Sequence, residues 1–302
     1  MKILVSGSTG FIGSALVPFL TSDGHSVVQL LRKPVATVNP TLTWDPAAGR
    51  VDAAAFEGFD AVVHLAGESI ASGRWTAAKK ERIRSSRVDA TRLLCNALAR
   101  LGRPPKALIC ASAIGYYGDR GDEVLREESA PGRDFLAGVC RDWEAASEPA
   151  ARKGIRVVNL RFGVVLGRGG GALAHMLPPF RLGLGGRIGS GRQYISWITL
   201  DDAVGSVQHA LATGALRGPA NAVAPRAVTN QEFTRTLGRT LGRPTLFPMP
   251  AFAARLAFGE MADALLLGSA RVEPARLLAS GYRFRHGDLE GSLRHLLDRK
   301  AR

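Results

Sequence analysis

A glycine-rich segment near the beginning of the chain is the clearest candidate for binding chemistry. Residues 7–13 read GSTGFIG, directly after the apolar run 2–6 and at the start of the amphipathic stretch 11–22. Between a strand and a helix, the first glycine permits a tight turn and the second lets backbone N–H groups approach a pyrophosphate. The third allows close packing of helix on strand, and the helix N-terminus adds partial positive charge. The segment predicts a dinucleotide site formed by Gly7, Thr9, Gly10, Phe11, Ile12 and Gly13.

The end of the second apolar run indicates which dinucleotide is bound. An acidic residue there would bind the adenosine ribose hydroxyls and favour NAD. The run 26–31 ends instead with Leu31 and is followed by Arg32 and Lys33. Arg32 can stack on adenine and form a bidentate pair with a 2′-phosphate. We therefore expect NADP (NADPH) as the cofactor, with these three residues in its site. The alternative is that the two cations are ordinary surface charges.

A third segment, residues 60–67, reads DAVVHLAG. A buried strand that ends in Ala-Gly brings its backbone close to the adenine-ribose side of a dinucleotide. We therefore add Leu65, Ala66 and Gly67 to the predicted cofactor site. We interpret His64 as a packed core histidine rather than a catalyst.

The pattern of apolar runs predicts the fold. Five short runs that are apolar on both faces alternate with longer amphipathic stretches, which is typical of βαβ units around a parallel sheet. The expected strands are 2–6, 26–31, 61–65, 107–111 and 156–160, and the expected helices are 11–22, 77–101 and 134–153. Beyond residue 160 the pattern changes to a flexible glycine break at 167–171, a strand-like run at 193–198, helices near 200–213 and 230–241, and short helices after 250.

These elements predict an α/β fold: a Rossmann-type doubly wound parallel sheet with a smaller, mostly helical C-terminal substrate lobe. Residues 1–166 and about 193–224 would form the dinucleotide-binding Rossmann domain. Residues 167–192 and 225–302 would form the smaller substrate-binding lobe.

The charge of the chain is strongly positive. It has 302 residues and a formal net charge of +14, with basic residues dispersed rather than gathered in a tail. A dispersed excess indicates a solvated surface and favours anionic ligands such as NADP. Nucleic acid is a weaker alternative because the interleaved aromatic residues of a nucleic-acid platform are missing. We expect no nucleic-acid partner.

Other classes of protein are disfavoured by what the sequence contains. No apolar run approaches the roughly 20 residues needed to cross a bilayer, and no signal peptide is apparent, so we expect a cytoplasmic protein without a membrane partner. The three cysteines form no CxxC pair, which predicts buried reduced thiols. The six histidines show neither HxxxH nor HExxH spacing, which predicts no metal site.

Together these segments resemble the extended short-chain dehydrogenase/reductases, the NAD(P)-dependent epimerase/dehydratase superfamily. The resemblance covers nearly the whole chain and includes LRFGVVLG at 160–167 and SWITLDD at 196–202. More narrowly, the chain resembles the atypical "epimerase family protein" branch, which has its own C-terminal domain. That likeness rests on AIGYYG at 113–118, CRDWE at 140–144, NAVAP at 221–225 and the segment 249–297.

The chain departs from the superfamily where proton transfer takes place. The family carries a Tyr-x-x-x-Lys pair on the helix after the fourth strand, in which the lysine lowers the tyrosine pKa. Here that helix reads FLAGVC at 135–140. The two positions fall on Leu136 and Cys140 or, in the other register, on Phe135 and Val139. The usual hydroxyl position is Ala113, with Ser112 one place earlier, and the usual asparagine position is Arg87.

The resemblance still suggests catalytic residues. Tyr116 and Tyr117 should lie near the C-terminal edge of the sheet, where ligands of open α/β folds bind. Either could donate a proton while Ser112 holds a substrate oxygen; the alternative is that both rings only pack the strand-to-loop junction. Glu144 has no basic neighbour at a telling spacing except Arg141, and we interpret it as structural.

Further binding residues follow from the family fold. The helix that carries Arg87 lines the cofactor groove, so Arg87, helped by Arg82, could bind the pyrophosphate or a substrate anion; the alternative is a solvated helix charge. Phe162 completes the predicted cofactor set. The region after the fifth strand shapes the substrate pocket in the family. Its candidate contacts are Arg161, Arg192, Gln193, Tyr194 and Trp197, and of these we favour Arg192, Tyr194 and Trp197.

Two functions fit these features. One is an NADP-dependent oxidoreductase or epimerase that acts on a small polar carbonyl or alcohol without the Tyr-x-x-x-Lys pair. The other is a non-catalytic NADPH sensor or regulatory binding protein, which the altered relay positions favour. The expected partner is a small-molecule substrate, and the expected state is a monomer or homodimer.

Overall fold

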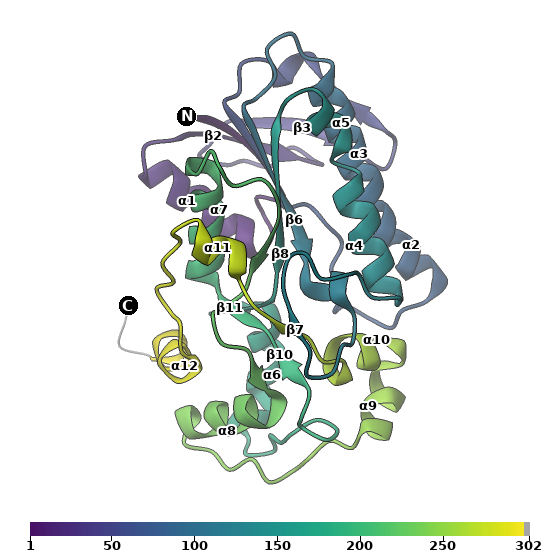
Figure 1. Cartoon of the computed structure of the whole chain (residues 1–302), viewed down its shortest axis with the longest axis vertical. Helices are drawn as coiled ribbons and strands as arrows, with labels where there is room; N and C mark the ends of the chain where they lie inside the picture. Colours follow the sequence, from purple (N-terminus) through teal and green to yellow (C-terminus); the bar gives the residue numbers. More distant parts are fainter. Residues whose placement is uncertain (299–302) are drawn as a thin grey trace.

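An eight-stranded sheet forms the centre of the molecule (Figure 1). The computed structural model describes residues 1–298. The strand order is β12-β8-β6-β5-β1-β2-β3-β4, and only the β3–β4 pair is antiparallel. The strands are β1 (Lys2–Ser6), β2 (Ser26–Leu31), β3 (Thr41–Asp45), β4 (Arg50–Val51), β5 (Ala61–His64), β6 (Ala107–Ala113), β8 (Arg156–Phe162) and β12 (Gly218–Ala222).

The strand order changes direction beside β1. The chain passes from β1 to β2 and β3 on one side, and later places β5 and β6 on the other side. In open α/β sheets, ligands bind outside the carboxyl ends of the strands at such a change of direction. The glycine segment 7–13 follows β1, and the segment 65–67 follows β5. The topology therefore brings two of the predicted cofactor segments to the same edge of the sheet, as the predicted Rossmann fold requires.

Helices cover both faces of the sheet (Figure 1). One face carries α1 (Phe11–Ser22) and α7 (Leu200–Ala212), and Leu16 and Val207 lie in the buried core on that side. The opposite face carries α2 (Ala77–Ser85), α3 (Val88–Ala99), α4 (Phe135–Ala145) and α5 (Glu148–Arg152). Leu94 of α3 packs there with Leu108 of β6 in a second core cluster. Burial on both faces explains why the strands read as continuous apolar runs.

Two predicted helices are each divided in the structure. The expected helix 77–101 is the pair α2 and α3, separated by a turn at residues 86–87, where the Arg87 side chain binds the Ile83 carbonyl at the end of α2. The expected helix 134–153 is the pair α4 and α5, and Pro149 lies at the start of α5, where its missing N–H costs no helical hydrogen bond. The predictions for 11–22 and 230–241 are confirmed.

The C-terminal region is mostly helical and lies below the sheet in Figure 1. A third core cluster joins α6 (Gly171–Arg181), α8 (Asn230–Leu241) and α12 (Leu289–Leu297) through Leu173, Phe233 and Leu293. The remaining elements are η1 (Ala54–Phe56), η2 (Ile114–Tyr117), β7 (Val124–Leu125), β9 (Val164–Gly167), β10 (Tyr194–Ile195), β11 (Trp197–Thr199), β13 (Val228–Thr229), α9 (Ala251–Phe258), α10 (Glu260–Ala262), η3 (Asp263–Leu267), β14 (Arg271–Val272) and α11 (Ala275–Ala279).

The C-terminal segment also returns to the Rossmann sheet. Leu277 of α11 is buried in the same core cluster as α1 and α7. The Tyr282 hydroxyl donates to the carboxylate of buried Asp202 on α7 at 3.0 Å. The proposed division of the chain at residues 166, 193 and 224 stays a prediction, and part of the segment after 224 packs on the sheet. Within residues 1–298, every helix is too short or too polar to cross a bilayer.

Candidate functional site

The glycine turn after β1 tolerates only glycine at two positions. Gly7 has φ +69°, and a Cβ there would lie 2.5 Å from the carbonyl carbon of Leu65. A Cβ on Gly13 would lie 2.1 Å from the Gly7 carbonyl oxygen. Both distances are below any real Cβ contact. The glycines therefore bring the turn against the 65–67 segment and α1 against the turn.

The same turn leaves hydrogen-bonding groups available to a ligand. Gly10 is the N-cap of α1, and no side chain caps this helix. The Ser8 hydroxyl is buried, the residue being 4 % exposed, and has no hydrogen-bond partner within residues 1–298. Thr9 and Gly10 are exposed. Free first-turn amides attract an anion, and a buried hydroxyl without a partner is costly unless a ligand satisfies it. These groups fit the pyrophosphate of a dinucleotide.

A second glycine segment encloses the Phe11 ring of this turn. A Cβ on Gly167, Gly170 or Gly171 would lie 2.5–2.7 Å from a carbon of that ring. Two β-bridges, Leu166 with Gly171 and Gly167 with Gly170, hold the segment in a narrow hairpin. The prediction of a flexible break at 167–171 is therefore wrong: the glycines are needed for close packing on Phe11. Ile12, the next residue of the turn, is half-buried.

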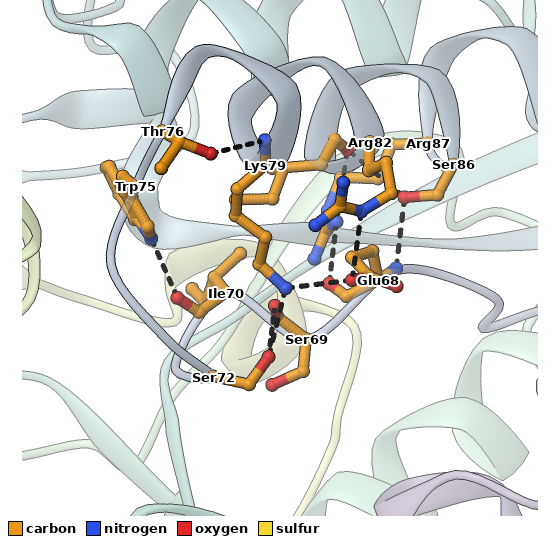
Figure 2. A network of polar contacts seen from close by, with 11 residues as sticks. Glu68, Ser69, Ile70, Ser72, Trp75, Thr76, Lys79, Arg82, Ser86 and Arg87 are labelled. Carbon is orange, nitrogen blue, oxygen red and sulfur yellow. Dashed lines mark hydrogen bonds and ion pairs between the residues drawn. The ribbon is translucent and has the colours of Figure 1, made fainter.

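Basic side chains gather around Glu68, which follows the 65–67 segment (Figure 2). The Nζ of buried Lys79 donates to Glu68 Oε1 at 2.8 Å and to the Ser72 hydroxyl at 2.9 Å. Arg82 Nε lies 3.8 Å from the same carboxylate oxygen. The Lys79 hydrogen bond, with the charges of Lys79, Arg82 and Arg32, lowers the pKa of Glu68. Arg82 therefore lies close to this carboxylate, and the charge of Arg32 also acts on it.

Arg87 fixes the backbone of this loop (Figure 2). Its Nη1 donates to the Glu68 carbonyl at 3.0 Å and to the Ile83 carbonyl at 3.2 Å, and its guanidinium lies 5.2 Å from the Trp143 ring centre. A Cβ on Gly67 would lie 3.3 Å from Arg87 Cζ. Burial lowers the pKa of Arg87. The structure places Arg87 against the 67–68 backbone; its binding of a ligand anion stays a prediction.

The outer predicted cofactor residues differ in exposure. Lys33 is exposed like Arg32, and Leu65 and Ala66 are half-buried. Leu31 is 6 % exposed and Phe162 is 7 % exposed, and Phe162 belongs to the core cluster beneath the sheet. These two side chains are therefore core residues, and their contact with a cofactor stays a prediction.

Apolar groups occupy the positions of the family's proton relay. Leu136 is 8 % exposed and Cys140 is 4 % exposed. A Cβ on Gly115 would lie 3.4 Å from Leu136 Cβ and 3.8 Å from Cys140 Sγ, so both side chains contact the η2 segment. Burial raises the pKa of Cys140 to about 12. Neither residue can exchange a proton near neutral pH. Phe135, in the other register, packs edge-to-face with Trp75 at 5.6 Å.

A buried ion pair lies beside these positions. Arg161 Nε donates to Glu144 Oε1 at 2.7 Å and Arg161 Nη2 donates to Oε2 at 2.8 Å. The Ser112 hydroxyl donates to the same Oε1 at 2.6 Å. Burial alone would lower the pKa of Arg161, but the hydrogen bonds and charge of Glu144 leave it raised. Glu144 is structural, as predicted, but its basic partner is Arg161 rather than Arg141.

Tyr117 belongs to this buried network. Its hydroxyl donates to Asn221 Oδ1 at 2.7 Å and accepts from Arg161 Nη1 at 2.9 Å, and the residue is 0 % exposed. Burial raises the pKa of Tyr117 to about 12, despite the opposing effect of Arg161. The prediction that Tyr117 donates a proton to a substrate therefore needs correction, because its hydroxyl is enclosed and already bonded.

Tyr116 has a different environment. It is half-buried, and its ring centre lies 3.5 Å from Arg161 Cζ. Its hydroxyl makes no hydrogen bond within residues 1–298, in contrast to that of Tyr117. The hydroxyl of Tyr116 is therefore free, and its ring lies on the Arg161 guanidinium. The same guanidinium binds the Glu144 carboxylate, which also accepts a hydrogen bond from Ser112.

The three predicted substrate contacts are not equivalent. Trp197 is 1 % exposed and its Nε1 donates to the Arg226 carbonyl at 3.1 Å, so the predicted substrate contact is wrong for this core residue. Arg192 is exposed, and Tyr194 is half-buried with Arg271 5.2 Å from its ring centre. Both remain available for a ligand.

His64 is a core residue, as interpreted from the sequence. One ring nitrogen lies 2.6 Å from the Ser6 hydroxyl and the other 3.0 Å from the Thr91 hydroxyl. Burial lowers the pKa of His64 to about 4, which keeps the ring neutral. The three cysteines are buried and free, also as predicted.

These features define a Rossmann protein whose glycine turn at residues 7–13 fits a dinucleotide. The sequence model of the NAD dependent epimerase/dehydratase family matches residues 3–222, and a domain of unknown function (DUF1731) matches residues 249–296. The chain therefore belongs to the NAD dependent epimerase/dehydratase family.

Named relatives extend over almost the whole chain. Epimerase family protein MT2273 of Mycobacterium tuberculosis is 45% identical over 291 residues, 96% of each chain. Human epimerase family protein SDR39U1 is 40% identical over 300 residues, 98% of this chain and 100% of the human one. The crystal structure of human SDR39U1 (isoform 2) with NADPH matches with a TM-score of 0.90 at 39% identity, covering 98% of this chain and 99% of the other.

Proposed function

We propose that the protein binds NADPH at the carboxyl end of β1 and exchanges hydride with a carbonyl or alcohol group of a small polar molecule. The observation that carries this proposal is the turn at residues 7–13, where Gly7 and Gly13 permit close contacts and Ser8 and the first α1 amides lack partners. The human relative that was crystallised with NADPH supports the same cofactor for this chain.

Exposed cations favour NADPH over NADH. Arg32 and Lys33 follow β2, and Arg82 lies near Glu68. A 2′-phosphate carries negative charge that a guanidinium binds through two parallel hydrogen bonds. Lys79 already offsets the Glu68 carboxylate at 2.8 Å, which leaves Arg32 to the phosphate.

Tyr116 is the proposed proton donor. When bound, the nicotinamide supplies or accepts a hydride. Tyr116 has the free hydroxyl that a carbonyl oxygen needs as it becomes an alcohol, and Arg161 lies 3.5 Å from the centre of its ring. Ser112 donates its own proton to Glu144, so it can accept a hydrogen bond from the hydroxyl of an alcohol substrate but donates none to a carbonyl oxygen. Arg192 and Tyr194 are the proposed substrate contacts.

A second candidate function is a non-catalytic NADPH sensor or regulatory protein. It is favoured by one specific observation: Leu136 and Cys140 occupy the relay positions, and the adjacent Ser112, Glu144 and Arg161 side chains satisfy one another. A site without a positioned relay still binds the cofactor.

Turnover by the parent separates the two candidates, and the Tyr116→Phe variant tests the proposed proton donor. NADPH affinity is measured by fluorescence titration, and hydride transfer is measured at the nicotinamide absorbance with a panel of aldehydes, ketones and sugar nucleotides. We expect the variant to bind NADPH like the parent and to transfer hydride roughly 10²–10⁴-fold more slowly. An unchanged transfer rate excludes Tyr116 as the acid. Tight binding by the parent without turnover of any compound supports the sensor.

A further inference from the structure

Three metal-ligating side chains meet where the C-terminal segment lies on α7. Asp201 is in the first turn of α7, His286 precedes α12, and His295 is in the last turn of α12. Asp201 Oδ2 lies 3.5 Å from His286 Nε2 and 3.1 Å from His295 Nε2. All three ligand atoms are within 4.8 Å of one another. We propose that these residues form a site for a divalent transition-metal ion of the zinc type.

The distances match tetrahedral coordination. Zinc bonds of about 2.0–2.1 Å at a tetrahedral angle place neighbouring ligand atoms roughly 3.3–3.4 Å apart. The two carboxylate-to-imidazole separations, 3.5 and 3.1 Å, are already close to that value. The third separation, between the two imidazole nitrogens, is within 4.8 Å.

The arrangement of the two rings is the second argument. Their centres are 4.5 Å apart and their planes differ by 23°, so the rings are stacked with both Nε2 atoms near one carboxylate oxygen. A metal ion lies in the plane of each imidazole that binds it, so at least one of the two rings must rotate to direct its Nε2 lone pair at a shared ion. Two stacked imidazoles at one carboxylate form a two-histidine, one-carboxylate ligand set, in which neutral imidazole and carboxylate suit zinc.

Other contacts hold the ligands in position. Buried Asp202 accepts the backbone N–H of Arg285 at 2.8 Å and that of His286 at 3.0 Å. Arg168 Nη2 donates to the His295 carbonyl. These hydrogen bonds hold the backbone at both histidines and leave the imidazole rings to turn. The side chains of Asp201, His286 and His295 remain 44, 20 and 47 % exposed, so an ion can enter and a water can complete the coordination.

The sequence could not indicate this site by local spacing. The two histidines are nine positions apart, and the carboxylate comes from α7, more than eighty positions earlier. The prediction of no metal site rested on the absence of HxxxH and HExxH, which detect only ligands on one helix. In the folded chain an ion at this place would tie α12 and the preceding segment to α7. The inference is independent of the proposed NADPH chemistry.

Metal binding by the tag-free full-length protein tests the proposal. After treatment with EDTA and dialysis, the protein is titrated with ZnCl₂ by calorimetry and melted with and without the ion. We expect one ion per chain and a melting temperature raised by about 3 °C or more when free zinc exceeds the Kd 100-fold. Co²⁺ in place of zinc should give the visible absorption of a four-coordinate site.

Two variants decide whether the proposed ligands are responsible. We expect the His286→Gln/His295→Ala double variant to lose the one-to-one zinc binding and the thermal shift, while melting in EDTA as cooperatively as the parent. His175→Ala, which removes an exposed histidine of α6, should keep both. The proposal is overturned if the parent binds no zinc stoichiometrically, or if the double variant binds it as tightly as the parent does.

Discussion

Arg161 on β8 and Glu144 on α4 form a two-pronged ion pair inside the protein, with both nitrogen-to-oxygen distances below 3 Å (2.7 and 2.8 Å). The same pair binds Ser112 on one side and Tyr117 on the other. It therefore connects the ends of β6 and β8 at the edge where the substrate is proposed to bind. Because the Arg161 side chain is only 2 % exposed, either charge would be costly without the other.

Breaking this pair should destabilise the fold. Glu144→Gln leaves the Arg161 charge buried without its counter-charge, so we expect the free energy of unfolding to fall by about 3–5 kcal/mol. Urea denaturation followed by circular dichroism measures the change. Glu148→Gln breaks the exposed pair with Arg152 and should cost less than about 1 kcal/mol. Similar losses of unfolding free energy in both variants would show that the buried pair stabilises the fold no more than the exposed pair does.

The glycine turn should tolerate no side chain at Gly13. A Cβ at this position meets the Gly7 carbonyl oxygen at 2.1 Å, which is backbone and cannot move aside. We expect Gly13→Ala to abolish NADPH binding and to lower the melting temperature. A Cβ on Gly138, within α4, would meet no atom within 4 Å, so Gly138→Ala should raise stability by about 0.5–1 kcal/mol and leave binding intact. NADPH binding by folded Gly13→Ala would contradict the assignment of the turn.

Cofactor choice should depend on Arg32. Arg32→Glu removes the proposed phosphate partner and adds repulsion, so we expect at least a tenfold loss of NADPH affinity and little change for NADH. Arg92→Glu makes the same charge change on an exposed part of α3 and should affect both cofactors slightly. Parallel titrations of the two coenzymes measure the effect. Equal losses for NADPH and NADH in Arg32→Glu would exclude a role at the 2′-phosphate.

Buried His64 should make stability depend on pH. Its pKa in the folded protein is lowered from 6.5 to about 4 by burial, so the unfolded chain binds the proton first. The stability contribution is complete above pH 6.5 and is lost as the pH falls from 6.5 towards 4. The slope is at most about 1.4 kcal/mol per pH unit for one proton.

The His64→Asn variant isolates this contribution. Urea midpoints between pH 7.5 and 4 should fall less steeply in the variant than in the parent, whatever its stability at neutral pH. The two pH dependences would coincide if His64 were already protonated in the folded protein or remained accessible to water.

Local features of the sequence predicted local structure well. The strands 2–6 and 26–31 and the helix 11–22 agree with the structure at both ends, because strand, turn and helix are set by neighbouring residues. β12 was missed because its sequence, GPANA, has neither β-branched nor aromatic residues and forms a strand by pairing with β8.

Long-range pairings account for what the sequence did not predict at the site. Glu144 and Arg161 are 17 positions apart on different elements. Trp197 was predicted to contact a substrate because the sequence does not show that it is buried in the core cluster of α6, α8 and α12. The 167–171 glycines suggested flexibility because nothing in the sequence shows that Phe11 packs on them. Glu68 could have been added to the predicted site from the sequence, because it directly follows the predicted segment 65–67.

Calorimetric titration of the purified protein with NADPH and with NADH tests the central claim most directly. The turn at residues 7–13 and the cation at Arg32 predict binding of one NADPH per chain, at least tenfold tighter than NADH. A protein that is folded by circular dichroism and releases no heat with either coenzyme would contradict the whole assignment.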